Sequence, residues 1–209
     1  MLSLLRKYEY AELEKLSLDG EILDLGGSRK SNYHGLLQGS HEITVVNFDE
    51  KYGFDLNFNL EEKFPLGNES YDNLLAINVL EHIFNYGDFF AESYRILKPG
   101  GKMVLTSPFF HQIHGCPYDY NRFTEDALKK ISLSHNFEIV SLKVLGSGIF
   151  SAIYQMLIGL IPTSTLKYIF QSACVFLDKL LILISRRYEK IAKNYPLGYV
   201  LILKKSERK

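Results

Sequence analysis

Two short segments of the sequence could bind the two ends of a ligand that contains a ribose. Residues 22–28 are Ile-Leu-Asp-Leu-Gly-Gly-Ser, an apolar run that stops at Gly26 and Gly27. Glycines let a ligand approach the backbone closely, and Asp24 adds a carboxylate that accepts hydrogen bonds. Asp49 ends a second apolar run roughly twenty residues later, where an acid can accept hydrogen bonds from both ribose hydroxyls. The alternative is a tight turn between a strand and a helix, with Asp49 exposed on the surface.

The glycine pattern argues against a ligand with a pyrophosphate group. A dinucleotide site has G-x-G-x-x-G at this place. Counted from Gly26, the second glycine is replaced by Ser28 and the third by Ser31. A ligand without phosphates therefore fits better, and a nucleotide-dependent oxidoreductase is disfavoured. Further along the chain, Asn59 offers an amide that could meet the edge of an adenine.

These residues need a scaffold that brings the ends of several strands together. Short apolar runs alternate with stretches of helical periodicity along the chain. We expect strands at residues 21–25, 42–48, 71–77, 102–106, 138–145 and 198–204, and helices at residues 1–18, 85–97 and 125–136. Thr124 is a suitable N-cap for the last of these helices. Such alternation predicts a mostly parallel sheet, covered on both faces, that binds ligands at the carboxyl ends of its strands.

Four motifs in this order resemble those of the class I methyltransferases that depend on S-adenosylmethionine (SAM). The motifs are ILDLGGS, NFDE, SYDNLLAINVLEHI and YRILKPGGKMVLTSPF. The similarity covers residues 20–145, is closest to small methyltransferase-domain families with a Leu-Glu-His segment, and extends to residues 198–204 as the last strand. The resemblance implies an enzyme with SAM as its cofactor. It also implies that residues 1–209 form a single α/β domain with a Rossmann-like, seven-stranded, mostly parallel sheet and helices on both faces.

The resemblance implies four groups of cofactor-binding residues. They are Asp24, Gly26, Gly27 and Ser28 around the methionine part; Asp49 with Glu50 at the ribose; Asn59 and Leu60 at the adenine; and Asn78, Val79 and Leu80 under the sulfonium end. The family often has GxGxG in the first group, whereas this chain has Gly-Gly-Ser-Arg-Lys at residues 26–30. This departure supports an alternative, a methyltransferase-like subunit that binds cofactor or a partner without catalytic turnover.

Residues 107–124 are the expected acceptor side of the site. They follow the fourth predicted strand, are too long for a simple connection, and are rich in His, Tyr, Asp and Arg. A hydroxyl acceptor needs a group that takes its proton. We predict His114 as this general base, His82 as its rival, and a pocket shaped by Asp119, Tyr120 and Arg122. The alternative is that Asp119 and Arg122 form a structural ion pair while the tyrosines pack on the sheet.

We predict no metal site from the sequence. His111, His114 and Cys116 form the pattern that most suggests one. A zinc site usually needs more ligands at firmer spacing.

The overall charge bears on whether the protein binds nucleic acid, and the cysteines bear on its cellular compartment. Lysine plus arginine and aspartate plus glutamate both number 24, so no global positive charge attracts nucleic acid. Cys116 and Cys174 are far apart and form no CxxC motif. Residues 1–10 are too charged for a signal peptide. We therefore expect a cytoplasmic protein and no nucleic-acid partner.

Residues 146–194 predict a two-helix insertion before the last strand. No charged residue occurs from 144 to 166, a length that exceeds a membrane span, but Pro162 and neighbouring polar residues interrupt the run. Lys167, Gln171 and Asp178 then mark a polar stripe, and a basic cluster follows at residues 186–193. The insertion could be a lid on the acceptor pocket, the face of a homodimer, or a hairpin in peripheral contact with a membrane. A true span is least favoured because residues 198–204 must return to the sheet.

The sequence thus predicts a SAM-dependent methyltransferase that acts on a small-molecule, glycan or lipid-linked acceptor, with oxygen as the methylated atom. A membrane contact would favour a lipid-linked acceptor such as a glycan intermediate or a quinone precursor.

Overall fold

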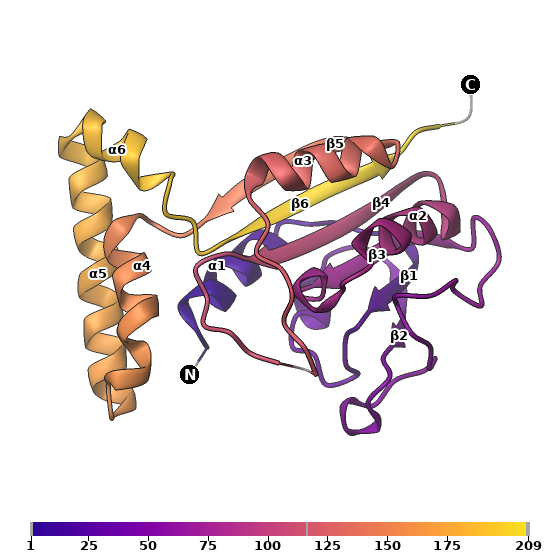
Figure 1. Ribbon diagram of the computed structural model, residues 1–209, viewed down its shortest axis with the longest axis horizontal. Helices are drawn as coiled ribbons and strands as arrows, with labels where there is room; N and C mark the ends of the chain where they lie inside the picture. Colours follow the sequence, from indigo (N-terminus) through magenta and orange to yellow (C-terminus); the bar gives the residue numbers. More distant parts are fainter. Residues whose placement is uncertain (1, 116, 208–209) are drawn as a thin grey trace.

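A central sheet of six strands organises the protein. The computed structural model describes residues 2–115 and 117–207 (Figure 1). The strands are β1 (Gly20–Leu25), β2 (His41–Val46), β3 (Tyr71–Ile77), β4 (Leu97–Pro108), β5 (Phe137–Leu145) and β6 (Gly198–Lys205), in the order β2-β1-β3-β4-β6-β5. The strands β1 to β4 are parallel to one another, and β6 is antiparallel to β4 and β5. This mostly parallel, Rossmann-like α/β sheet confirms the predicted fold class.

The described residues do not contain the seventh strand that the resemblance implies. Between β2 and β3, residues 47–70 contain the short 3-10 helix η2 (Glu50–Tyr52) and make only one isolated bridge, between Val46 and Leu56. At the same edge the side chain of Asp55 accepts a hydrogen bond from the backbone N–H of Val45 at 2.9 Å. Because a side chain takes this donor, residues 54–60 do not extend the ladder as a further strand.

Helices cover both faces of the sheet, as predicted. The helices α2 (Tyr86–Ile96) and α3 (Glu125–Ser134) pack on the face that carries Leu74 and Ala76, whereas α1 (Leu4–Leu13) packs on the face that carries Leu75 and Ile77. Successive residues of β3 thus point to opposite faces, as the pleat of a strand requires. Thr124 caps α3 as predicted, because its hydroxyl accepts a hydrogen bond from the backbone N–H of Ala127 at 3.2 Å.

The insertion between β5 and β6 is helical. It contains α4 (Ile149–Leu157), the 3-10 turn η4 (Ile158–Leu160), α5 (Ser164–Ile184) and α6 (Arg186–Ala192). Figure 1 shows α4, α5 and α6 standing beside the sheet, at the left of the molecule. Leu4 and Leu5 of α1 pack against Tyr154 of α4 and Cys174 of α5. In the described part of the chain, no helix combines the length and the apolar character that crossing a bilayer requires.

A buried carboxylate holds the three helices of the insertion together. Asp178 of α5 is fully buried and accepts hydrogen bonds from the backbone N–H groups of Phe150 and Ser151 at 3.0 and 2.8 Å. It also accepts from the hydroxyls of Ser151 and of Tyr188 in α6. Ser151, one of the polar residues in the apolar run, therefore serves an interaction inside the insertion.

Candidate active site

A cavity of about 650 Å³ lies at the carboxyl ends of β1, β2 and β3. The predicted site residues that line it are Gly26, Gly27, Ser28, Asn59, Leu60, Asn78, Val79, His82, His114 and Tyr120. The cavity thus joins the segments predicted to hold a cofactor to the loop predicted to hold an acceptor. The predicted residues with described side chains that lie outside its lining are Asp24, Asp49, Leu80, Asp119 and Arg122. No described residue of the 146–194 insertion lines it.

The turn after β1 has room only for glycine at two positions. Gly26 has a φ of +79°, and a Cβ there would lie 2.8 Å from a methyl carbon of Val79. A Cβ at Gly27 would lie 1.8 Å from Oδ2 of Asp24. Asp24 is fully buried, and its Oδ2 lies 2.7 Å from both the Tyr33 hydroxyl and Nε2 of His34. Its Oδ1 is also buried and has no hydrogen-bond partner among the described residues.

Asn47 holds this turn in place, and the sequence analysis did not single it out. Its side-chain amide donates hydrogen bonds to the carbonyls of Gly26 and Gly27 at 3.2 and 2.7 Å. Its Oδ1 accepts from the backbone N–H groups of Phe48 and Asp49. Asn47 directly follows the last residue of β2 and lines the cavity. The signal that could have identified it is this position, because ligand-binding residues gather just after parallel strands.

The acid predicted to hold the ribose faces a different partner. The carboxylate of Asp49 lies 2.5 Å from the ammonium group of Lys51, and this hydrogen bond lowers the pKa of Asp49. The ribose role of Asp49 stays a prediction, which requires its side chain to leave Lys51. Glu50 begins η2, and its side chain lies outside the described part of the structure.

The two residues predicted at the adenine have different environments. Asn59 is exposed, and its side chain bonds to the backbone N–H of Glu61 and to the carboxylate of Glu62, both at 3.0 Å. Leu60 is buried in the main core and also lines the cavity. Both stay candidates for the adenine contact.

The segment after β3 turns sharply into the cavity. Asn78 has a φ of +53°, and its backbone N–H donates to the hydroxyl of Thr106 at 2.9 Å. Its side-chain oxygen is buried and has no hydrogen-bond partner among the described residues. Val79 lines the cavity, whereas Leu80, the first residue of the 3-10 turn η3 (Leu80–His82), is fully buried in the core. Asn78 thus offers a free polar atom, and Leu80 supports the segment.

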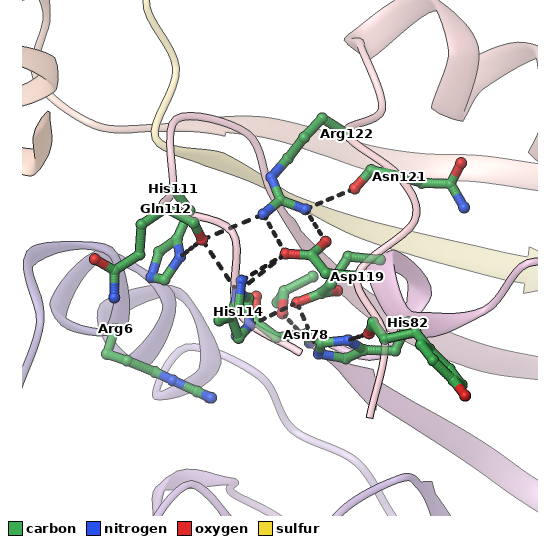
Figure 2. A network of polar contacts seen from close by, with 12 residues as sticks. Arg6, Asn78, His82, His111, Gln112, His114, Asp119, Asn121 and Arg122 are labelled. Atoms are coloured by element: carbon green, nitrogen blue, oxygen red, sulfur yellow. Dashed lines mark hydrogen bonds and ion pairs between the residues drawn. The ribbon is translucent and has the colours of Figure 1, made fainter. Parts of the chain in front are cut away.

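Backbone hydrogen bonds join η3 to the acceptor-side loop. Figure 2 shows the polar side chains around this junction. The N–H groups of Tyr120 and Asn121 donate to the carbonyl of Glu81 at 2.8 and 3.3 Å. Nδ1 of His82 bonds to the carbonyl of Tyr118. As a result, the rings of His82 and His114 lie edge to face with centroids 5.1 Å apart. The two predicted bases therefore share one polar centre.

Asp119 positions His114 and is itself fixed by Arg122. The guanidinium of Arg122 binds both carboxylate oxygens of Asp119, one of them at 2.7 Å. Asp119 also accepts from the backbone N–H of His114 at 2.9 Å and lies 3.4 Å from its Nδ1. The hydrogen bond from Arg122 lowers the pKa of Asp119 to about 2. The ion pair that we considered as a structural alternative exists, and it also orients the predicted base.

Glu81 is a buried carboxyl group, the glutamate of the Leu-Glu-His segment, and its sequence position alone gave it no role. It is fully buried, and neither of its side-chain oxygens has a hydrogen-bond partner among the described residues. Oε1 lies 3.8 Å from Nε2 of His82 and 3.9 Å from Nε2 of His114. Burial raises the pKa of Glu81 to about 8, and the nearby carboxyl of Glu9 adds to this increase. Glu81 therefore holds a proton at neutral pH.

Glu81, His82 and His114 could hold a metal ion, because one ligand atom from each lies within 4.8 Å of the others. His111, which the sequence pattern suggested as a ligand, lies with its ring 4.8 Å from that of His114. Cys116 lies outside the described residues. The absence of a metal stays a prediction.

The comparisons with known proteins agree with the fold and the motifs. Residues 23–105 match the family model of the methyltransferase domain. A protein of Mycolicibacterium smegmatis named "Probable S-adenosylmethionine-dependent methyltransferase" is 29% identical over 68 residues, which cover 32% of this chain and 26% of that protein. The match therefore spans about a quarter of this relative's length. Residues 23–105 thus resemble a methyltransferase domain, and the chain shares its fold with solved methyltransferases that depend on SAM.

Solved structures share the fold at low sequence identity. A SAM-dependent methyltransferase from Archaeoglobus fulgidus has a TM-score of 0.59 and 16% identity, with 96% of this chain and 91% of that chain covered. One from Methanosarcina mazei has a TM-score of 0.56 and 16% identity, with coverage of 100% and 99%. The [4+2]-cyclase SpnF has a TM-score of 0.60 and 16% identity, with coverage of 97% and 82%. The fold thus also occurs in a protein named for a different reaction.

Proposed function

We propose that the protein transfers a methyl group from SAM to an oxygen atom of a small-molecule, glycan or lipid-linked acceptor. The observation that carries this proposal is the shared cavity, which is lined by both the glycine turn after β1 and His114. When bound, SAM supplies a methyl group that is already activated on a positively charged sulfur. The protein must then align the acceptor, exclude water and accept one proton.

Features of the cavity fit SAM. Gly26 and Gly27 line the cavity and carry no side chains, so their backbone is open to a ligand. The buried oxygens of Asp24 and Asn78 lack hydrogen-bond partners among the described residues, so a ligand with amino or hydroxyl donors would satisfy them. Asp24, Gly26, Gly27 and Asn78 would hold the cofactor, with Asn47 keeping the turn in position.

His114 would take the proton that an acceptor hydroxyl loses. Its Nδ1 faces the Gln112 carbonyl at 3.3 Å and Asp119 at 3.4 Å, which leaves Nε2 as the accepting atom. Asp119 is negatively charged at neutral pH, so it orients the ring and stabilises the imidazolium that forms. His82 is the second candidate, but burial lowers its pKa and makes it a weaker base.

The charge of the cavity disfavours a nucleic-acid acceptor. Among the described residues that line it, Arg6 is the single lysine or arginine. Binding to a phosphate backbone needs several such groups in a row. A small, glycan or lipid-linked acceptor is more compatible with this lining.

Calorimetric titration with SAM and a release assay for S-adenosylhomocysteine test the proposal. We expect saturable binding of SAM, and release of one S-adenosylhomocysteine for each methylated acceptor from a panel of hydroxyl compounds. A wild-type protein that binds no SAM would refute the proposal.

The second candidate is a cofactor-binding subunit without turnover, favoured by the Gly-Gly-Ser-Arg-Lys turn and by the orientation of Asp49 toward Lys51. SAM binding combined with no product from the whole panel would support this second function.

A further inference from the structure

The hairpin, defined as α4, η4 and α5 (residues 149–184), carries a concentrated apolar surface. Twelve of the 22 exposed large hydrophobic side chains of the described chain lie in it. Leu183 is 83% exposed, Leu160 80% and Phe176 64%. Contiguous apolar surface of this kind marks an interaction site in most proteins.

The apolar residues of α5 lie on one side of the helix. They include Leu166, Ile169, Phe176, Leu180 and Leu183, whose spacing of three, four or seven residues places them in one stripe. The opposite side carries Gln171, which bonds to Lys7 of α1, and the buried Asp178. The polar side of α5 thus faces the protein, and its apolar side faces away from it.

The segment that carries this surface is also strongly basic. Residues 144–197 contain six lysines and arginines and two acids, which gives a charge of +4 in a chain whose net charge is zero. One of the two acids is the buried Asp178. Arg186, Arg187 and Lys190 are exposed on α6, directly after the apolar end of α5. Exposed apolar surface therefore adjoins exposed positive charge.

We propose that the hairpin docks on the surface of an anionic membrane. Its apolar stripe would lie at the boundary between headgroups and acyl chains, and the cations of α6 would face anionic headgroups. A second copy of the chain fits less well, because it would bring two segments of charge +4 together with few acids between them.

The docking surface lies at the same end of the sheet as the candidate active site, the end that contains the carboxyl ends of β4 and β5. Pro108 at the end of β4 pairs with Gly198, and Gly198 pairs with Leu145 at the end of β5. The acceptor-side loop and the insertion therefore start at the same level of the sheet. Phe110 of this loop stacks on Tyr195 with ring centroids 6.2 Å apart. If the proposed methyl transfer holds, on which this step rests, membrane docking favours a lipid-linked acceptor.

Vesicle co-sedimentation tests the docking. The probes are vesicles of phosphatidylcholine alone and of phosphatidylcholine mixed with phosphatidylglycerol. We expect wild-type protein to bind the mixed vesicles, and Phe176→Glu combined with Leu183→Glu to weaken binding by about tenfold or more. Arg186→Gln combined with Arg187→Gln should weaken binding to the mixed vesicles and reduce its dependence on salt. Leu133→Glu, which charges an exposed leucine of α3, is the matched control and should bind as wild type does.

Two outcomes would overturn the docking. One is wild-type protein that stays in the supernatant with mixed vesicles while a known lipid-binding protein sediments. The other is a hairpin variant that binds as well as wild type. Light scattering tests whether the hairpin binds a second copy of the chain instead. A wild-type dimer that does not bind vesicles, and that dissociates in the Phe176→Glu variant, would show that it does. SAM titration of every variant separates this test from the proposed function, because the hairpin variants should keep wild-type SAM affinity.

Discussion

At the scale of single residues, the polar centre around His114 combines groups that sequence spacing could not relate. Asp119 and Arg122 come from the acceptor-side loop, and Glu81 and His82 come from η3. Their contact depends on backbone hydrogen bonds to the Glu81 carbonyl, which join segments almost forty residues apart.

We expect His114→Ala to lower turnover by about 10²–10⁴-fold, the usual range for loss of a general base. SAM affinity should change little, because the cofactor-binding turn is not altered. Calorimetry and product release measure the two effects separately. His41→Ala is the control, since His41 lies at the start of β2, away from the carboxyl ends of the strands. Equal loss in both variants would remove His114 from its proposed role.

Glu81→Gln should stabilise the protein in a pH-dependent way. The pKa of Glu81 is about 8 in the folded protein and 4.5 in the reference state, so the folded protein keeps a proton that the unfolded chain releases between these values. Wild-type stability therefore falls as pH rises from about 4.5 to about 8. Glutamine cannot ionise, so the variant's gain in unfolding free energy should grow by about 1–3 kcal/mol from pH 5 to pH 8. Urea unfolding at the two pH values measures this gain, and a gain that shrinks instead would contradict the burial of a protonated Glu81.

Chelation distinguishes a proton-accepting His114 from a metal-binding one. A metal ion on Nε2 of His114 would prevent that atom from taking a proton. We expect product release to be unchanged after treatment with EDTA and gel filtration. Loss of turnover that returns with a single divalent cation would assign Glu81, His82 and His114 to a metal site instead.

At the scale of elements, the turn after β1 shows how tightly the cofactor side is built. Gly27→Ala should lower SAM affinity by about tenfold or more, because the new Cβ would overlap the carboxylate of Asp24. Gly35→Ala is the matched control, since a Cβ at Gly35 meets no atom within 4 Å. Titration with SAM compares the two variants, and equal affinities would show that the turn tolerates a side chain.

The sequence predicts most elements because each strand is a short apolar run that ends at a polar or glycine-containing turn. It does not predict side-chain direction. Asp49 turns to Lys51 because two oppositely charged side chains two residues apart can pair locally. Asn47 falls inside the strand expected at residues 42–48, so its position just after β2 and its bonds to the glycine turn emerge only from the structure. The expected seventh strand depends on the family pattern, and in this chain Asp55 occupies the edge of β2.

At the scale of the whole molecule, the insertion is separate from the cavity. No described residue of the insertion lines the cavity, and the lid that the sequence suggested stays a prediction. Apolar periodicity alone predicted two helices but not which side of α5 faces the protein. The inward orientation of Gln171 and Asp178 is set by long-range partners on α1, α4 and α6.

The pairing of Leu145 with Gly198 has a consequence for how the chain could be shortened. These residues end adjacent antiparallel strands, so a two-residue Asn-Gly turn could replace residues 146–197 and close an ordinary β-hairpin. Deletion of residues 146–197 exposes Leu4 and Leu5, so the shortened chain should also carry Leu4→Ser and Leu5→Ser.

We expect the shortened protein to fold and to bind SAM, as circular dichroism and calorimetry would show, and to lose all affinity for vesicles. A shortened chain that retains its sheet but no longer binds SAM would mean that the helices of the insertion stabilise the cavity without lining it. If SAM binding survives, the insertion is a module that can be removed without loss of the cofactor site, and the proposed membrane docking is lost with it.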